Sequence, residues 1–173
     1  GGEIELDRTI IDQLGEPLVH LLRNALDHGI EKPDARAKLN KSKIGTIKLV
    51  ARSERNVAII EVEDDGQGLN LEKIREAAVR KKLITNNEAA KMDDEETKEL
   101  LLTSMLSTSE KVTELSGRGV GLNVVKTSVD SLGGRVKIDS HPGKGMKVTL
   151  ELPLTLAIIR ALLTKVGEEI YAI

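Results

Sequence analysis

The chain lacks cysteine, tryptophan and phenylalanine and has a single tyrosine among its 173 residues. Without cysteine it can form neither disulfides nor thiolate metal sites, which fits a reducing compartment. Its core must be built from Leu, Ile, Val and Ala, and stacking on nucleic-acid bases is limited to Tyr171. The net charge of −2 provides no overall basic field for nucleic acid. No apolar run is long enough to span a bilayer, so we expect neither nucleic-acid binding nor direct membrane insertion.

The polar face of a helix predicted over residues 9–29 has an unusual composition. His20, Asn24 and His28 follow one another at i, i+4 and i+8, so an α-helix would bring them close together, with Asp27 beside them. A solvated face normally uses Glu, Lys and Gln, which are better helix formers. An Asn amide oxygen suits one position on a hydrated Mg²⁺, and a nearby His can accept a proton. An ordinary solvated face remains the alternative.

A second group lies where a predicted strand, residues 57–63, ends. There the chain reads Asp64-x-Gly66-x-Gly68. A carboxylate at this place can accept a hydrogen bond from an exocyclic amine such as that of adenine, and the glycines let the backbone approach a flat ring. A common Asp-Gly turn is the alternative. Residues 45–52 are predicted to pair with this strand as a hairpin, and a helix over 71–82 follows, with Lys73 in its first turn.

A third group is a glycine-rich loop, Gly117-Arg118-Gly119-Val120-Gly121, before a helix predicted to run to residue 132. Free N–H groups at a helix start form a cradle for anions. The spacing is wrong for a dinucleotide fingerprint and no Walker lysine is present. A flexible hinge is the alternative. Residues 84–116, which precede the loop, are predicted to be a lid, a binding loop or a disordered segment. Strands are predicted over 135–139 and 146–152.

The order of these elements resembles the GHKL ATP-binding fold, an α/β (α+β) two-layer sandwich with a mixed sheet covered on one face by helices. Within that superfamily, two stretches resemble the chemotaxis histidine kinases of the CheA family. They read His-Leu-Leu-Arg-Asn-Ala-Leu-Asp-His-Gly-Ile-Glu from residue 20 and Ser-Gly-Arg-Gly-Val-Gly-Leu-Asn-Val-Val-Lys from residue 116. The resemblance implies an ATP-binding kinase domain over residues 1–152. It also implies that residues 153–173 are a linker or the start of a truncated CheW-like regulatory domain.

The resemblance also implies residue roles. Asn24 would coordinate Mg²⁺ between the phosphates of ATP, and His20 holds the position where gyrase-like ATPases carry a Glu base. His28 and Lys73 would contact phosphate oxygens, and Asp64 would bind the adenine amine. The implied nucleotide-binding set comprises Asn24, Asp27, His28, Asp64, Gly66, Gly68, Lys73, Gly117, Arg118, Gly119, Val120, Gly121 and Met146.

The same resemblance implies a cytoplasmic histidine kinase whose phosphate acceptor lies on a separate phosphotransfer domain. His20, His28 and His141 are the only histidines, and none sits on a separate phosphoacceptor helix. We expect this stretch of chain to be monomeric. A CheW-like regulatory domain or coupling protein and chemoreceptors are expected partners through the rest of the chain.

Two departures leave alternatives open. CheA-like lids carry Phe-x-Pro-Gly-Phe-Ser-Thr, whereas residues 103–108 read Thr-Ser-Met-Leu-Ser-Thr. The family has Gly-Thr in its last hairpin, whereas this chain has Gly145-Met146, which lacks the hydroxyl. The alternatives are a nucleotide-binding module with impaired catalysis and a different GHKL enzyme, such as an anti-sigma-factor kinase or a MutL-like ATPase.

Overall fold

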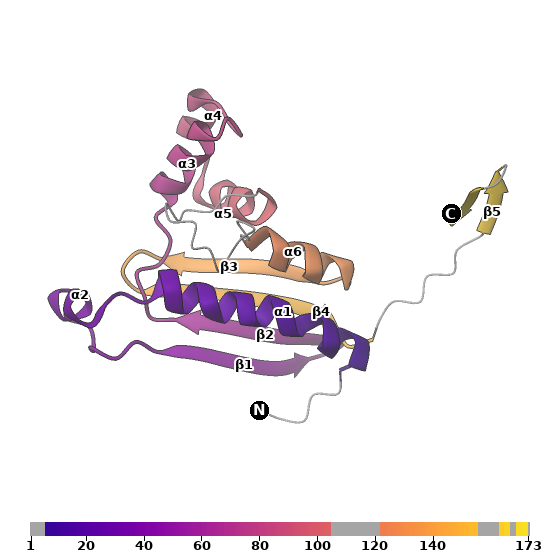
Figure 1. Ribbon diagram of the computed structural model, residues 1–173, viewed down its shortest axis with the longest axis horizontal. Coiled ribbons are helices and arrows are strands. Elements are labelled where there is room, and N and C mark those ends of the chain that lie inside the picture. Colours follow the sequence, from indigo (N-terminus) through magenta and orange to yellow (C-terminus); the bar gives the residue numbers. More distant parts are fainter. Residues whose placement is uncertain (1–5, 105–121, 156–162, 167–168, 173) are drawn as a thin grey trace.

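The computed structural model describes residues 6–104, 122–155, 163–166 and 169–172. A four-stranded sheet with strand order β1-β2-β4-β3 forms one layer, and helices form the other (Figure 1). The strands are β1 (Ile47–Glu54), β2 (Val57–Asp64), β3 (Arg135–His141) and β4 (Gly145–Pro153). The helices are α1 (Arg8–Asn24), the π-helical turn η1 (Ala25–Gly29), α2 (Pro33–Lys38), α3 (Leu71–Arg80), α4 (Asn86–Lys91), α5 (Asp94–Thr103) and α6 (Leu122–Ser131).

The two faces of the sheet differ in character. Val62 pairs with Val148 and Ile60 with Leu150 on the face that joins the core, where all four side chains are buried. On the opposite face the next pair is Glu63 with Lys147. This alternation is the period of two that a half-buried strand requires. The core is aliphatic, as the sequence predicted, and it takes its helical share from buried residues of α1, α3, α5 and α6.

The prediction of a mixed sheet is wrong for the part of the chain that the structure describes. All three ladders of the four-stranded sheet are antiparallel. Short turns join β1 to β2 and β3 to β4, and a tight turn between neighbouring strands reverses the chain. Among the described helices, none is long and apolar enough to cross a bilayer.

The segment after α3 also differs from expectation. Residues 84–116 were expected to be a lid, a binding loop or a disordered segment, and α4 and α5 contradict the disordered alternative for the described part, up to residue 104. Both helices begin with a capping box, Thr85 with Glu88 and Asp93 with Glu96. In each box the side chains satisfy free N–H groups of the first turn. These short signals are present in the sequence, but the weak apolar periodicity around them concealed the helices.

The chain ends in a second, two-stranded sheet of β5 (Leu163–Val166) and β6 (Glu169–Ala172). The two strands pair antiparallel.

Candidate functional site

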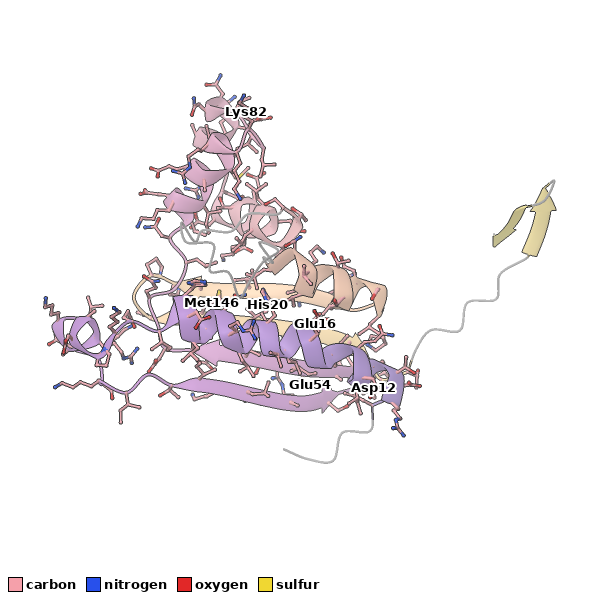
Figure 2. The ribbon with its side chains drawn as sticks, viewed as in Figure 1. Asp12, Glu16, His20, Glu54, Lys82 and Met146 are labelled. Atoms are coloured by element: carbon pink, nitrogen blue, oxygen red, sulfur yellow. The ribbon has the colours of Figure 1, made fainter. Side chains whose placement is uncertain are left out.

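The site begins at the C-terminal end of α1. Asp7 caps the start of this helix by accepting a hydrogen bond from the Thr9 N–H at 2.8 Å, and Ile10, Leu14 and Leu21 bury its apolar face. Asp12, Glu16 and His20 follow one another along another face (Figure 2). His20 and Asn24 are half-buried near the end of the helix. Both side chains therefore lie at the edge of the core and not on a fully solvated surface.

The last turn of this helix is wider than predicted. Residues 25–29 form a π-helical turn, closed by a hydrogen bond of 2.8 Å from the Ile30 N–H to the Ala25 carbonyl. A π-turn holds more residues per turn than an α-helix and is frequent at functional sites. The expectation of an α-helix through residue 29 is therefore wrong for its last turn, which carries Asp27 and His28. Both side chains are exposed.

His20 carries a buried nitrogen, Nε2, that has no hydrogen-bond partner among the described residues. Burial lowers the pKa of His20, the positive charge of Arg23 lowers it further, and the negative charge of Glu16 acts in the opposite direction. The imidazole is therefore neutral at neutral pH. A neutral imidazole with an unpaired nitrogen can accept a proton or bind a ligand group.

We expect His20 to titrate below the ordinary histidine pKa of 6.5 in an NMR pH titration. Arg23→Gln should raise the midpoint and Glu16→Gln should lower it, because each removes one of the two named charges. The lowered pKa also means that the unfolded state binds more protons than the folded state below pH 6.5. The contribution of His20 to stability is thus complete above pH 6.5 and is lost as pH falls toward its folded-state pKa. A midpoint at or above 6.5 would contradict this account.

Asp64, the last residue of β2, is buried with 5% of its surface exposed. Its Oδ1 accepts a hydrogen bond of 2.9 Å from the Gly66 N–H. Burial raises the pKa of Asp64, the N–H groups of Gly66 and Met146 lower it, and the charges of Asp65 and Glu31 raise it. A buried carboxylate with one oxygen held by a backbone N–H retains acceptor capacity for a ligand donor.

The Asp64–Gly68 turn is held against the π-turn of the helix. Gln67 donates from its backbone N–H to the Gly29 carbonyl at 2.9 Å and from its side chain to the His28 carbonyl at 2.6 Å. A Cβ on Gly66 would lie 2.0 Å from the Gly29 oxygen, and one on Gly29 would lie 3.1 Å from Oδ2 of Asp64. The structure thus brings Asp64 to the helix end that carries Asn24. The sequence interpretation missed Gln67 and treated Gly29 only as a helix terminator.

The turn between β3 and β4 completes the surroundings of Asp64. Gly68 has a φ of +70°, and a Cβ there would lie 2.4 Å from the His141 carbonyl oxygen. The Gly143 N–H donates to the Gln67 carbonyl at 2.7 Å. Met146 lies opposite Asp64 in the β2–β4 ladder. Figure 2 shows Met146 at the end of the sheet toward which α1 runs.

The remaining predicted site residues are Lys73 and the residues of the glycine-rich loop. Lys73 is exposed in the first turn of α3, where its backbone N–H donates to the Asn70 side chain at 3.0 Å. The predicted loop of Gly117, Arg118, Gly119, Val120 and Gly121 lies outside the described residues. A hollow of about 480 Å³ between α3 and α4 contains none of the predicted site residues, so it does not mark this site.

Comparisons with known proteins identify the family of the chain. Residues 12–170 match the family described as histidine kinase-, DNA gyrase B-, and HSP90-like ATPases. The chain is 49% identical over 173 residues to the chemotaxis protein CheA of Bacillus subtilis (strain 168), which covers 100% of this chain and 26% of that protein. It is 46% identical over 173 residues to the sensor histidine kinase CheAY of Helicobacter pylori, which covers 100% of this chain and 22% of that protein. The chain thus spans about a quarter of the length of these relatives.

A solved structure supports the fold independently. The catalytic domain of the histidine kinase ThkA superposes with a TM-score of 0.51 at 20% sequence identity. The match covers 87% of this chain and 70% of that chain. At this level of identity the likeness concerns the arrangement of helices and strands alone.

Proposed function

Because the chain belongs to the family of histidine kinase-, DNA gyrase B-, and HSP90-like ATPases, we propose that it binds Mg²⁺-ATP for transfer of the γ-phosphoryl group to a histidine of a separate phosphotransfer domain. The observation that carries the proposal is the buried Asp64 carboxylate, held by the Gly66 N–H and packed against the end of the helix that carries Asn24. Asp64 accepts a hydrogen bond from the adenine amine, and Gly66 and Gly68 keep the backbone close to the ring.

The residues at the helix end fit the phosphate side of such a site. Asn24 makes no side-chain capping hydrogen bond to the π-turn that follows it, so its amide oxygen remains available as a neutral ligand for Mg²⁺. Magnesium, when bound with ATP, neutralises charge on the phosphate oxygens. His28 and Lys73 have exposed side chains that can contact the phosphates. The loop of residues 117–121, which is also assigned to the phosphates in this proposal, lies outside the described residues.

Neutral His20 has a limited task in this chemistry. The accepting imidazole already carries a nucleophilic lone pair, so phosphoryl transfer depends mainly on positioning and on stabilisation of charge. A gyrase-like ATPase must instead activate water, which requires a strong base. The unpaired Nε2 of His20 therefore serves to position a group or to hold a proton rather than to drive hydrolysis.

The acceptor lies outside this stretch of chain. His20 belongs to the proposed nucleotide site, His28 sits in the π-turn, and His141 is exposed beside Asp139 at 3.4 Å. The names of the relatives, chemotaxis protein CheA and sensor histidine kinase CheAY, support a role in chemotaxis signalling. We include a cytoplasmic location in this proposal. We include in this proposal a CheW-like regulatory domain or coupling protein and chemoreceptors as partners of the full protein. The separate β5–β6 sheet supports a second domain that begins in residues 153–173.

The alternative proposal is a nucleotide-binding module with impaired transfer. It rests on residues 103–108, whose sequence lacks the Phe, Pro and Gly of CheA-like lids. Most of these residues lie outside the described part of the chain. The two proposals predict the same nucleotide binding and differ in phosphoryl transfer.

We expect saturable, Mg²⁺-dependent binding of ATP by calorimetry, followed by transfer of radiolabelled γ-phosphate to an added phosphotransfer domain from a CheA relative. Binding without transfer supports the impaired module, and hydrolysis without transfer supports another ATPase of the family. A phosphotransfer domain whose acceptor histidine is replaced with Gln is the matched control and should remain unlabelled. Absence of nucleotide binding would contradict both proposals.

A further inference from the structure

A network of four charged side chains, from Glu31, Arg36, Lys41 and Asp65, contacts the Asp64–Gly68 turn. The Arg36 side chain, from α2, is 1% exposed and forms ion pairs of 2.9 Å with both Glu31 and Asp65. Lys41 forms a third ion pair with Glu31 at 2.7 Å. The two ion pairs of Arg36 supply the opposite charge that makes burial of its guanidinium group tolerable.

The cations also bind the backbone that follows Asp64. Lys41 Nζ donates to the carbonyl oxygens of Asp65 at 2.9 Å and Gly66 at 2.6 Å. Arg36 donates to the same Asp65 carbonyl at 3.2 Å and to the Ser42 carbonyl at 2.6 Å. The Asp65 carbonyl therefore accepts hydrogen bonds from two cationic side chains, and such charge-assisted bonds are stronger than those between neutral groups.

The Asp65–Gly66 peptide connects these hydrogen bonds to the Asp64 carboxylate. The Asp65 carbonyl and the Gly66 N–H belong to one planar peptide, and the described residues contain no cis peptide bond. In a trans peptide the carbonyl and the N–H point in opposite directions. Fixing the carbonyl toward Lys41 and Arg36 therefore aims the Gly66 N–H at Oδ1 of Asp64, where it donates at 2.9 Å.

We infer that Lys41 and Arg36 are positioning residues for the adenine-recognition carboxylate and act on Asp64 through the Asp65–Gly66 peptide. The inference rests on the proposed nucleotide-binding function. Neither cation is paired with Asp64 itself, so their effect on the ligand is indirect. Because Lys41 also holds the Gly66 carbonyl, two successive peptides of the turn are oriented by one side chain.

Titration behaviour of the two anions is consistent with a persistent network. Burial acts to raise the pKa of Glu31, but hydrogen bonds and charge from Lys41, together with the Arg36 hydrogen bond, outweigh it and hold the pKa below the ordinary value. Burial likewise opposes ionisation of Asp65, while the Thr46 N–H, Arg36 and Lys41 lower its pKa. Both carboxylates therefore stay charged at neutral pH and keep the two cations in place.

The test replaces Lys41 with Met in the complete chain, because this removes the cation and retains an unbranched side chain of similar length. We expect about tenfold weaker ATP binding, the scale of one lost charge-assisted hydrogen bond. The ratio of ATP to GTP affinity should fall by a similar factor, since GTP carries an oxygen where ATP carries the amine that Asp64 recognises. Lys41→Arg, which restores a cationic donor, should recover at least half of the lost discrimination.

Lys43→Met is the matched control, because Lys43 is exposed two residues away and loses the same charge. The inference is overturned if Lys41→Met and Lys43→Met bind ATP and discriminate GTP equally, while the unmodified chain binds ATP. It is also overturned if Lys41→Met lowers the melting temperature and leaves the ATP-to-GTP ratio unchanged, which indicates a structural role alone. Failure of the unmodified chain to bind ATP contradicts the proposed function instead, and calorimetry on that chain distinguishes the two cases.

Discussion

Asp64→Asn is expected to weaken ATP binding by about a hundredfold, because it removes a charged acceptor worth about 1.5–3 kcal/mol and presents a donor to the adenine amine. Asn has the same size, and its oxygen can still accept the Gly66 N–H that Asp64 accepts at 2.9 Å. Its NH₂ group then faces the amine, and two donors cannot form a hydrogen bond. Calorimetry with Mg²⁺-ATP measures the loss of affinity.

The melting temperature separates this loss from unfolding. Burial raises the pKa of Asp64, so its charge is disfavoured in the folded state, and a neutral Asn should not lower the melting temperature at neutral pH. Glu63→Gln is the control, because Glu63 is the exposed neighbour on the opposite face of β2 and also loses one negative charge. ATP affinity that survives in Asp64→Asn, or is lost equally in Glu63→Gln, would contradict the assigned role.

Gly145→Ala is expected to destabilise the fold by about 4 kcal/mol, combining backbone strain with severe overpacking. Gly145 has a φ of +107°, and a Cβ there would lie 1.9 Å from the Asp64 carbonyl oxygen. The obstructing atom belongs to the backbone of β2, so a side-chain rotation cannot relieve the overlap. The loss is measured as the change in unfolding free energy by chemical denaturation, or as failure of the variant to fold.

Gly143→Ala is the matched comparison in the same turn. Gly143 also has a positive φ, +76°, but a Cβ there would meet no atom within 4 Å. It should therefore cost only about 1 kcal/mol, the backbone component alone. Equal losses for the two variants would show that close approach of β4 to Asp64 is not what requires glycine at position 145.

Local patterns in the sequence predicted a large part of this molecule. The strand that ends at Asp64, the helix that begins at Leu71 and the aliphatic core follow from periodicity and capping residues close together in the chain. One expectation was wrong, and helices in a second segment were not predicted, both for identifiable reasons. The last turn of the first helix widened into a π-turn, and residues 86–103 formed helices whose capping boxes outweighed their weak periodicity.

The residues of the candidate site could be predicted from the sequence, but their arrangement in space could not. His20, Asn24 and Asp64 could be singled out because their residue types are unusual for a helix face and a strand end, which are properties of short segments. Their mutual placement depends on contacts between segments far apart in the chain, such as Gln67 with the Gly29 carbonyl. The roles of these residues toward ATP remain predictions for the experiments above.

The ion-pair network of Glu31, Arg36, Lys41 and Asp65 could not be predicted from the sequence. Arg36 and Lys41 lie in a segment whose composition is typical of an exposed loop, and no local pattern distinguishes a buried cation from a solvated one. Their positions depend on hydrogen bonds to the Asp65 and Gly66 carbonyls, which belong to a segment far away in the chain. Short-range patterns thus specified the chemical groups and the elements that carry them. Only the tertiary structure decided that Lys41 lies against the Gly66 carbonyl, 25 residues away in the chain. The physical reason is that backbone carbonyls removed from water need hydrogen-bond donors, and these can come from distant segments.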